Sequence, residues 1–270
     1  MKNPDTQNFI FHDEFLRINK SLEEQLEIRC LDLHSIQLAL TNITDAKHIK
    51  VPSTYISYFL KRTSQDIYNE FVSHTKGNIE LMLARINNYF AQNILSRAEE
   101  HLIEGLILLR VIQSQTSPTI SAKDFNEQLD QERSKTRTFG TLENEIKARI
   151  KKSGDDIIES DSSYYSYLHH YVTLRNCLTH RGGRITAKEN DLEIRLPYIS
   201  EEQINNATKT DSTNPIIPQT IVRKWNLGDT INLNLQEVEG IAYGLLKTTT
   251  KILRHMYKAT DRHVEHLIKK

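Results

Sequence analysis

Hydrophobic residues recur every three to four positions along most of the chain, which is the period of an amphipathic α-helix. The longest such run ends at Gln113, before a polar segment that contains Pro118. Another run ends at His180, close to Gly182 and Gly183, which are strong signals for the end of a helix. The pattern predicts helices over about residues 13–40 (one helix or two), 55–72, 78–113, 142–151, 163–180 and 236–270.

Two short segments instead alternate between apolar and polar residues, as half-buried strands do. These segments are Asp191–Ile199 and Thr230–Leu235. The polar stretch Asn205–Pro218 between them predicts a loop. The pattern therefore predicts a mainly α fold, a helical bundle with a small β-hairpin-like insertion after the helix that ends at His180.

The domain organisation is expected to follow from the same pattern. A chain of 270 residues is long enough for one large domain, or for a domain with an extension. We expect a boundary near residue 75, with a helical N-terminal extension over residues 1–75. The main helical domain then covers residues 76–270 and carries the strand and loop insertion at about 184–235. One continuous bundle fits the pattern equally well.

The composition narrows the classes of function. Lysine plus arginine and aspartate plus glutamate both total 35, so the formal charge is zero. This balance argues against a histone-like or wholly disordered nucleic-acid binder but leaves room for a local basic face. The two lone cysteines, Cys30 and Cys177, suit a reducing compartment and offer no metal quartet. Because the start of the chain lacks the layout of a signal peptide and the apolar stretch Leu102–Ile112 is too short to cross a bilayer, we expect a cytoplasmic protein without a membrane segment.

Arg175 is the most informative residue, because it falls in the apolar stripe of the helix predicted over residues 163–180. At about 100° per residue, that stripe is formed by Tyr164, Leu168, Tyr171 and Leu178. A cation at the centre of an apolar face needs an acidic partner, a hydrated cleft or an interface. One interpretation is a structural ion pair with an acid of the preceding long helix, such as Glu99, Glu100 or Glu104.

Asn176 and His180 favour a functional interpretation of Arg175. Arginine is a permanent, fork-shaped cation that matches phosphate oxygens. Histidine suits proton transfer at neutral pH, and His180 lies in the last turn of its helix, where it can be presented outward. Asn176 can orient either side chain by hydrogen bonding. Together the three residues fit the cleavage of a phosphate ester, with His180 acting on a ribose hydroxyl and Arg175 stabilising charge on phosphorus.

The run from Arg175 to His180 resembles the R-x4–6-H motif of HEPN domains, in which a polar residue commonly follows the arginine and the motif closes a helix of an all-helical bundle. The resemblance implies a metal-independent endoribonuclease that acts on RNA as a homodimer, with no cofactor and no metal. It assigns Arg175 and His180 of two protomers to a shared cleft, with Asn176 as the auxiliary residue. It also implies a toxin or an effector of antiviral defence, with an antitoxin or defence-system protein as partner. A toxin subgroup has a modified tyrosine where this chain has Gly182, so control by that modification is not expected.

Other features were weighed against this site. The chain from Lys247 to Lys270 holds seven basic and two acidic residues, a net charge of +5, and Gln131 to Lys152 holds seven and three, a net charge of +4. Either segment could steer RNA phosphates if it lies beside the motif, or could simply be a solvated helix face. His263 and His266 are interpreted as surface residues rather than metal ligands. Because some HEPN domains are non-catalytic, the second functional hypothesis is a helical interaction module or the regulatory partner of an effector.

Overall fold

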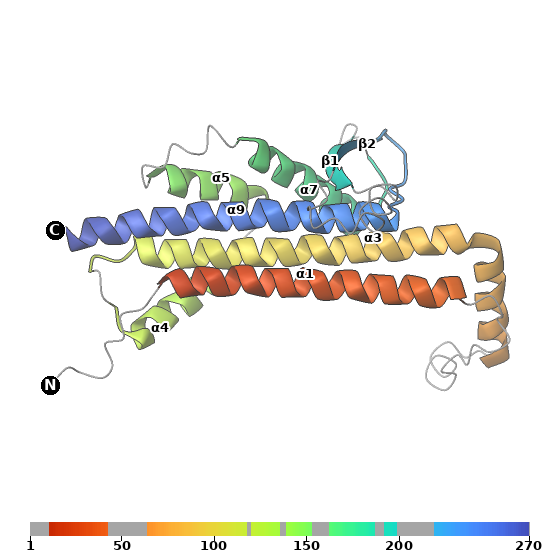
Figure 1. Cartoon of the computed structure of the whole chain (residues 1–270), viewed down its shortest axis with the longest axis horizontal. Coiled ribbons are helices and arrows are strands. Elements are labelled where there is room, and N and C mark those ends of the chain that lie inside the picture. The colour runs from red at the N-terminus through yellow and green to blue at the C-terminus, as the bar shows by residue number, and fades with distance from the viewer. Residues whose placement is uncertain are drawn as a thin grey trace, which may run out of the picture.

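The computed structural model describes residues 11–42, 64–117, 120–135, 139–152, 162–186, 192–198 and 219–269. Three long helices, α1 (Phe11–Asn42), α3 (Ser64–Gln113) and α9 (Leu235–Ile268), run side by side along the molecule (Figure 1). The first part of α3 turns away from the rest of that helix. The shorter helices are α4 (Ala122–Arg133), α5 (Phe139–Lys152) and α7 (Ser162–His180).

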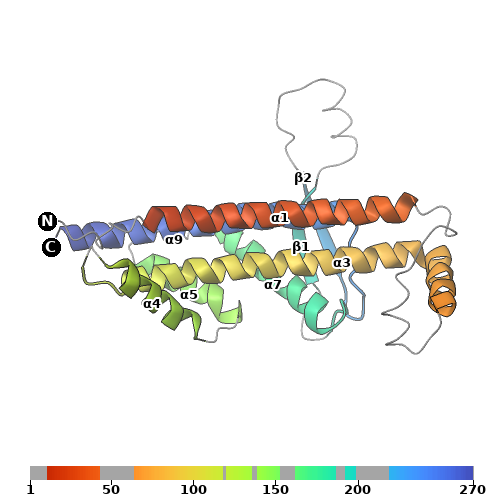
Figure 2. The same ribbon diagram turned by 90° about the horizontal axis from the view of Figure 1, so that it is seen from below.

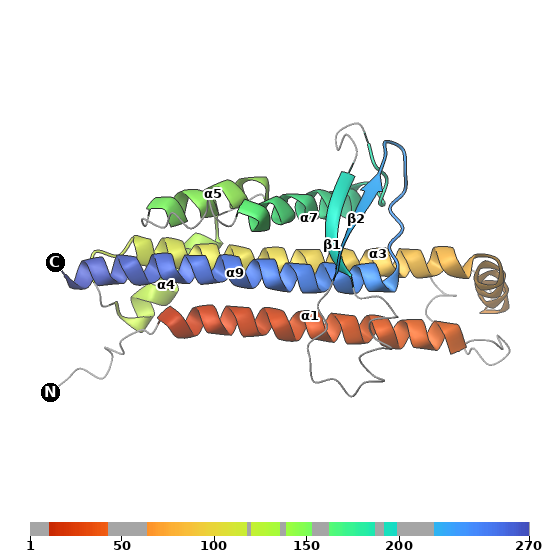
Figure 3. The same cartoon turned by 45° about the horizontal axis from the view of Figure 1, so that its top comes forward.

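The shorter helices cover different sides of the three-helix bundle. Helices α5 and α7 follow one another along the α3–α9 pair, on the side opposite α1 (Figure 3). Helix α4 packs on α3 at the end where the C-terminus lies. Seen from below, α1 runs lengthwise beside both α3 and α9 (Figure 2). The motif helix α7 is therefore held against α3 and α9.

The long helices bury their apolar stripes against one another. Leu22 and Leu33 of α1, Leu102 and Leu106 of α3, and Met256 of α9 are fully buried. Removing a leucine side chain from water stabilises a fold by about 1.5–3 kcal/mol, so each of these buried leucines helps to hold the bundle together. Among the described helices, none has a stretch both long and apolar enough to cross a membrane.

A two-stranded antiparallel sheet packs on the bundle. It pairs β1 (Leu192–Tyr198) with β2 (Gln219–Trp225), and Leu192 lies opposite Trp225. The alternate residues Leu192, Ile194 and Leu196 are buried against α7 and α9. The backbone of α9 approaches β1 so closely that a Cβ atom on Gly240 would lie 2.1 Å from the carbonyl oxygen of Pro197. The predicted mainly α fold with a small β-hairpin is confirmed.

The second strand was predicted at the wrong place. Only Thr230 of the segment Thr230–Leu235 makes a bridge, to Arg184, and the true partner of β1 is β2. The alternation was real, because Ile231 and Leu233 are buried, but the segment is extended without a partner strand. Instead of a partner strand, a side-chain amide of α3 forms hydrogen bonds with the backbone of this segment. Asn88 donates to the carbonyl of Ile231 (2.6 Å) and accepts from the backbone N–H of Leu233 (3.2 Å).

Two other predictions differ in detail from the structure. The sequence predicts separate helices over residues 55–72 and 78–113. In the structure one continuous helix, α3, covers parts of both ranges, so the domain boundary predicted near residue 75 lies inside a helix. The division into two domains stays a prediction, and the described N-terminal helix α1 shares its core with α7 and β1. The helix predicted over residues 142–151 corresponds to α5, which begins at Phe139, and no helix was predicted where α4 lies. The predicted loop Asn205–Pro218 lies outside the described residues.

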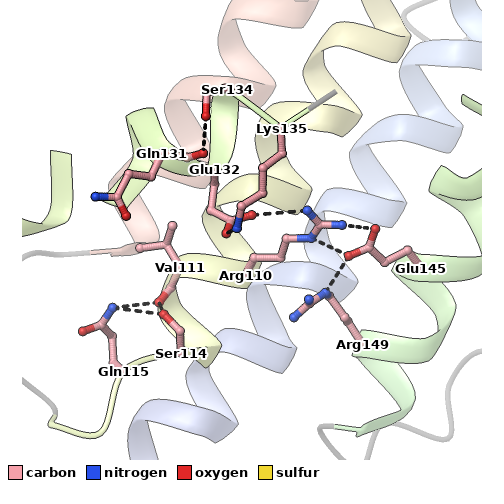
Figure 4. Close-up of polar contacts among 10 residues, drawn as sticks. All are labelled: Arg110, Val111, Ser114, Gln115, Gln131, Glu132, Ser134, Lys135, Glu145 and Arg149. Carbon is pink, nitrogen blue, oxygen red and sulfur yellow. Dashed lines mark hydrogen bonds and ion pairs between the residues drawn. The ribbon is translucent and has the colours of Figure 1, made fainter. Parts of the chain in front are cut away.

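A half-buried charged network joins α4 and α5 to α3 (Figure 4). Arg110 of α3 pairs with Glu132 of α4 at 3.2 Å and with Glu145 of α5, and Arg149 also contacts Glu145 at 2.9 Å. Burial by itself raises the pKa of the Glu145 carboxyl, but the hydrogen bonds and charges of Arg110 and Arg149 outweigh it and lower that pKa. Ionised Glu145 is therefore favoured by folding.

Candidate active site

The motif helix α7 ends at His180 because the following residues turn the backbone. The N–H groups of Arg181 and Gly183 both donate to the carbonyl of Cys177, at 3.2 and 3.0 Å. Gly182 and Gly183 have φ angles of 59° and 82°, a region that favours glycine. The N–H of Ile231 then donates to the carbonyl of Gly183 at 2.8 Å, which ties the turn to the segment before α9.

Arg175 is paired on both sides. Its Nη1 donates to Oδ1 of Asn176 at 3.0 Å, and its Nη2 lies 3.3 Å from Oε2 of Glu99 on α3. The side chain of Arg175 is 26% exposed and that of Glu99 is 14% exposed, so the ion pair lies at the edge of the core rather than inside it. The Nε atom of Arg175 is buried and has no hydrogen-bond partner among the described residues. The guanidinium is therefore held in place by Asn176 and Glu99, and its Nε–H remains as a donor without an acceptor in the described residues.

The surroundings of this ion pair are apolar and tight. A hollow of about 10 Å³ beside Arg175 has room for about one water molecule. Burial raises the pKa of the Glu99 carboxyl, the charge of Arg175 lowers it in part, and the nearby Glu100 raises it further. The other residues that line the hollow are Leu95, Ala98, Tyr171, Val172 and Leu245.

The structure selects one of the three acids predicted as partners of Arg175. Glu100 pairs with Arg97 on its own helix at 2.6 Å, and Glu104 pairs with Arg133 of α4 at 3.0 Å. Glu99 alone of the three contacts Arg175 in the described part of the chain. Glu99 is therefore the acid that the structural interpretation of Arg175 requires.

His180 is exposed at the end of α7 and is not joined to the ion pair. Five residues along a helix correspond to about 7.5 Å of rise and about 140° of net rotation, so His180 and Arg175 face different directions. Within the described residues, no hydrogen bond or ion pair connects the two side chains. The structure therefore brings Arg175 and Asn176 together and leaves His180 apart from them in a single chain. The side chains of Tyr164 and Leu168 lie outside the described part, and Tyr171 belongs to the core.

Cys177 lies inside the motif but is not a nucleophile. It is fully buried, and burial raises the pKa of its thiol although Arg181 lowers it in part. Burial likewise raises the pKa of Cys30 to about 11. Both thiols therefore stay protonated at neutral pH, and nucleophilic attack requires the thiolate.

Comparison with family models, with curated proteins and with solved structures finds no match for this chain. The resemblance to HEPN domains rests on the residues from Arg175 to His180 and on their position at the end of a helix in a helical bundle. Cleavage of RNA, dimerisation and a role in defence are accordingly proposals, argued below from the site.

The two basic segments meet each other near their C-terminal ends. Lys152 at the end of α5 and Arg262 of α9 line one hollow together with Gln113, the last residue of α3. Gln113 follows Glu99 by fourteen residues on α3, about 21 Å along the helix axis. The segment Lys247–Lys270 begins two residues after Leu245, which lines the hollow beside Arg175, so only the later part of this segment lies away from the motif.

Proposed function

We propose that the chain is a metal-independent endoribonuclease that acts as a homodimer, with Arg175, Asn176 and His180 as its site residues. The observation that carries the proposal is the position of the Arg175–Asn176 pair on α7. A guanidinium that is 26% exposed is oriented by two neighbours, and an exposed histidine ends the same helix. Such a fixed cation needs no reorganisation when charge develops on a phosphate oxygen.

The chemistry is intramolecular transesterification of RNA. His180 accepts the proton of a ribose 2′-hydroxyl, the 2′-oxygen forms a bond to phosphorus, and the bond from phosphorus to the 5′-oxygen breaks. The products are a 2′,3′-cyclic phosphate and a 5′-hydroxyl. Arg175 stabilises the negative charge on the phosphoryl oxygens. Since one histidine cannot be base and acid at once, His180 of the second protomer protonates the leaving 5′-oxygen.

The small size of the hollow at Arg175 supports a dimeric site. A space of about 10 Å³ admits a water molecule but no nucleotide. In a single chain, moreover, His180 faces away from Arg175. A two-fold dimer that apposes the exposed ends of two α7 helices supplies both a substrate cleft and a second histidine. We place this activity in the cytoplasm, as a toxin or antiviral-defence effector that a partner protein restrains.

A second candidate function is a non-catalytic helical interaction module. The Arg175–Glu99 ion pair favours it, because a cation that neutralises a buried acid already has a structural role. In that case Arg175 serves the packing of α7 on α3, and no RNA is cut.

Incubation of the purified chain with total RNA in excess EDTA separates the two candidates. The ribonuclease produces fragments that end in a 2′,3′-cyclic phosphate, and His180→Ala abolishes them. His34→Ala is the matched control, since His34 is also an exposed histidine but lies on α1, where it pairs with Glu239 at 2.5 Å. Intact RNA after incubation with dimeric wild-type protein favours the interaction module.

A further inference from the structure

A polar hollow lies between Gln113 of α3, Lys152 of α5 and Arg262 of α9. The ends of α3 and α5 and the C-terminal end of α9 lie at the same end of the bundle (Figure 1). The hollow has a volume of about 360 Å³, within the range of small-molecule sites, and is formed where the last turns of α3 and α5 meet α9. No carboxylate lines it among the described residues. The lining side chains are Gln113, Lys152, Arg262, His263 and His266.

The charge of this hollow is positive. Lys152 and Arg262 contribute two full positive charges. The C-terminal ends of α3 and α5 face the same region, and each contributes about half a negative charge. The two helix ends together offset about half of the charge that these two side chains bring.

Three acids near the hollow in the described part of the chain have partners of their own. Glu145 is neutralised by Arg110 and Arg149, as Figure 4 shows. On α9, Asp261 and Glu265 form a stripe adjacent to that of Arg262 and His266, because residues four apart share a helix face. Within that stripe Glu265 pairs with Lys269 at 3.6 Å, and Asp261 accepts a hydrogen bond from Tyr257. The acids thus lie beside the hollow without lining it.

Part of the lining is held in place before any ligand arrives. Nε2 of His263 donates to the backbone carbonyl of Gln115 at 3.2 Å. The side-chain amide of Gln113 accepts from Arg149 Nη1 at 3.1 Å and donates to the Arg149 carbonyl at 3.2 Å. A site ordered in advance loses less entropy on binding.

We propose that this hollow binds the phosphate groups of a nucleotide-type ligand. Arginine and lysine are the side chains that recognise phosphate, and a hollow of this size accommodates a nucleoside triphosphate. The same chemistry also suits consecutive phosphates of an RNA strand. The site lies about 21 Å along α3 from Glu99, so it is separate from Arg175, and the inference does not depend on ribonuclease activity.

Isothermal titration of the full chain tests the proposal with two probes, adenosine triphosphate and a 2′-O-methyl oligouridine of five nucleotides without terminal phosphates. The site variant is Lys152→Gln/Arg262→Gln. The control is Lys20→Gln/Arg29→Gln, which removes the same charge from exposed positions of α1. We expect the Kd of at least one probe to rise by about tenfold or more in the site variant and by less than about twofold in the control. Thermal melting confirms that both variants fold.

The probes distinguish the source of the phosphate. An effect confined to the triphosphate assigns the hollow to a free nucleotide, and one confined to the oligonucleotide assigns it to an RNA strand. Arg262→Lys, which keeps the charge but loses the fork, should bind better than Arg262→Gln. Absence of binding of both probes at millimolar concentration overturns the proposal, and so does an equal loss of affinity in the site and control variants.

Discussion

The guanidinium of Arg175 on α7 and the carboxylate of Glu99 on α3 form an ion pair, with Nη2 and Oε2 3.3 Å apart, at the edge of the helical core. This pair explains how a cation stands in the apolar stripe of α7, since the charge is matched and partly hydrated. It also fixes the direction of the guanidinium, whose other terminal nitrogen donates to Asn176. The same contact therefore serves the packing of two helices and the orientation of the proposed catalytic cation.

The ion pair predicts a measurable coupling between the two residues. Arg175→Ala leaves Glu99 unpaired, and Glu99→Ala leaves Arg175 unpaired, so each should lower the free energy of unfolding by about 1–3 kcal/mol. The double variant should lose less than the sum, by about 1 kcal/mol. Urea denaturation at pH 7 gives all three values. Additivity within about 0.3 kcal/mol shows that the pair does not stabilise the fold.

The charged network around Arg110 predicts a loss of stability in acid. The folded-state pKa of Glu145 is lowered, so its contribution is present above the unfolded pKa of about 4.3 and is lost as the pH falls through the lower, folded-state pKa. Glu145→Gln should therefore destabilise the chain by about 1–2 kcal/mol at pH 7, and the difference should shrink towards pH 3. Urea denaturation over pH 3–7 measures this. Glu127→Gln is the control, because Glu127 is an exposed acid whose pairing with Lys123 at 3.9 Å contributes little. A difference that stays constant over this range contradicts the prediction.

The close approach of α9 to β1 predicts sensitivity at Gly240. A Cβ atom there would lie 2.1 Å from the Pro197 carbonyl oxygen, so the hairpin backbone must move, and Gly240→Ala should cost about 1–3 kcal/mol. In Gly105→Ala the added atom meets the end of the flexible Leu253 side chain instead, so the cost should be smaller. Thermal melting of Gly240→Ala, Gly105→Ala and wild type measures the two losses of stability. Equal melting temperatures in Gly240→Ala and wild type would show that the hairpin adjusts freely.

Helical periodicity was sufficient to predict the mainly α fold, because apolar stripes such as that of Leu102 and Leu106 have to be buried. The second strand was misplaced because Ile231 and Leu233 alternate like a strand but satisfy their backbone through Asn88, a residue more than 140 positions away. Such a tertiary hydrogen bond leaves no local pattern. β2 was missed because its less exposed positions include the charged residue Arg223 and an exposed position holds the apolar Val222, so the sequence does not alternate as the exposure does.

For the candidate site, spacing on α7 identified Arg175 as a cation that needs a partner, and three acids of α3 were named as examples of that partner. Spacing could not choose among them, because the choice depends on the rotation of α3 against α7. The rotation of five residues along a helix already implies that His180 and Arg175 face different directions. The small size of the hollow beside Arg175 depends on how α3, α7 and α9 pack, which the sequence does not show. The meeting of α5 and α9 at Lys152 and Arg262 required the tertiary fold.

The single-turnover rate of cleavage of a defined single-stranded RNA in excess EDTA tests the central claim most directly. The wild-type dimer should cut it to 2′,3′-cyclic phosphate ends. Arg175→Ala and His180→Ala should each lower the rate by about 100-fold or more while remaining folded, whereas Arg29→Ala, which removes an ion-paired arginine from α1, should retain the wild-type rate. Equal rates in wild type and both site variants, or cleavage that disappears in EDTA and returns with a divalent cation, would contradict the claim.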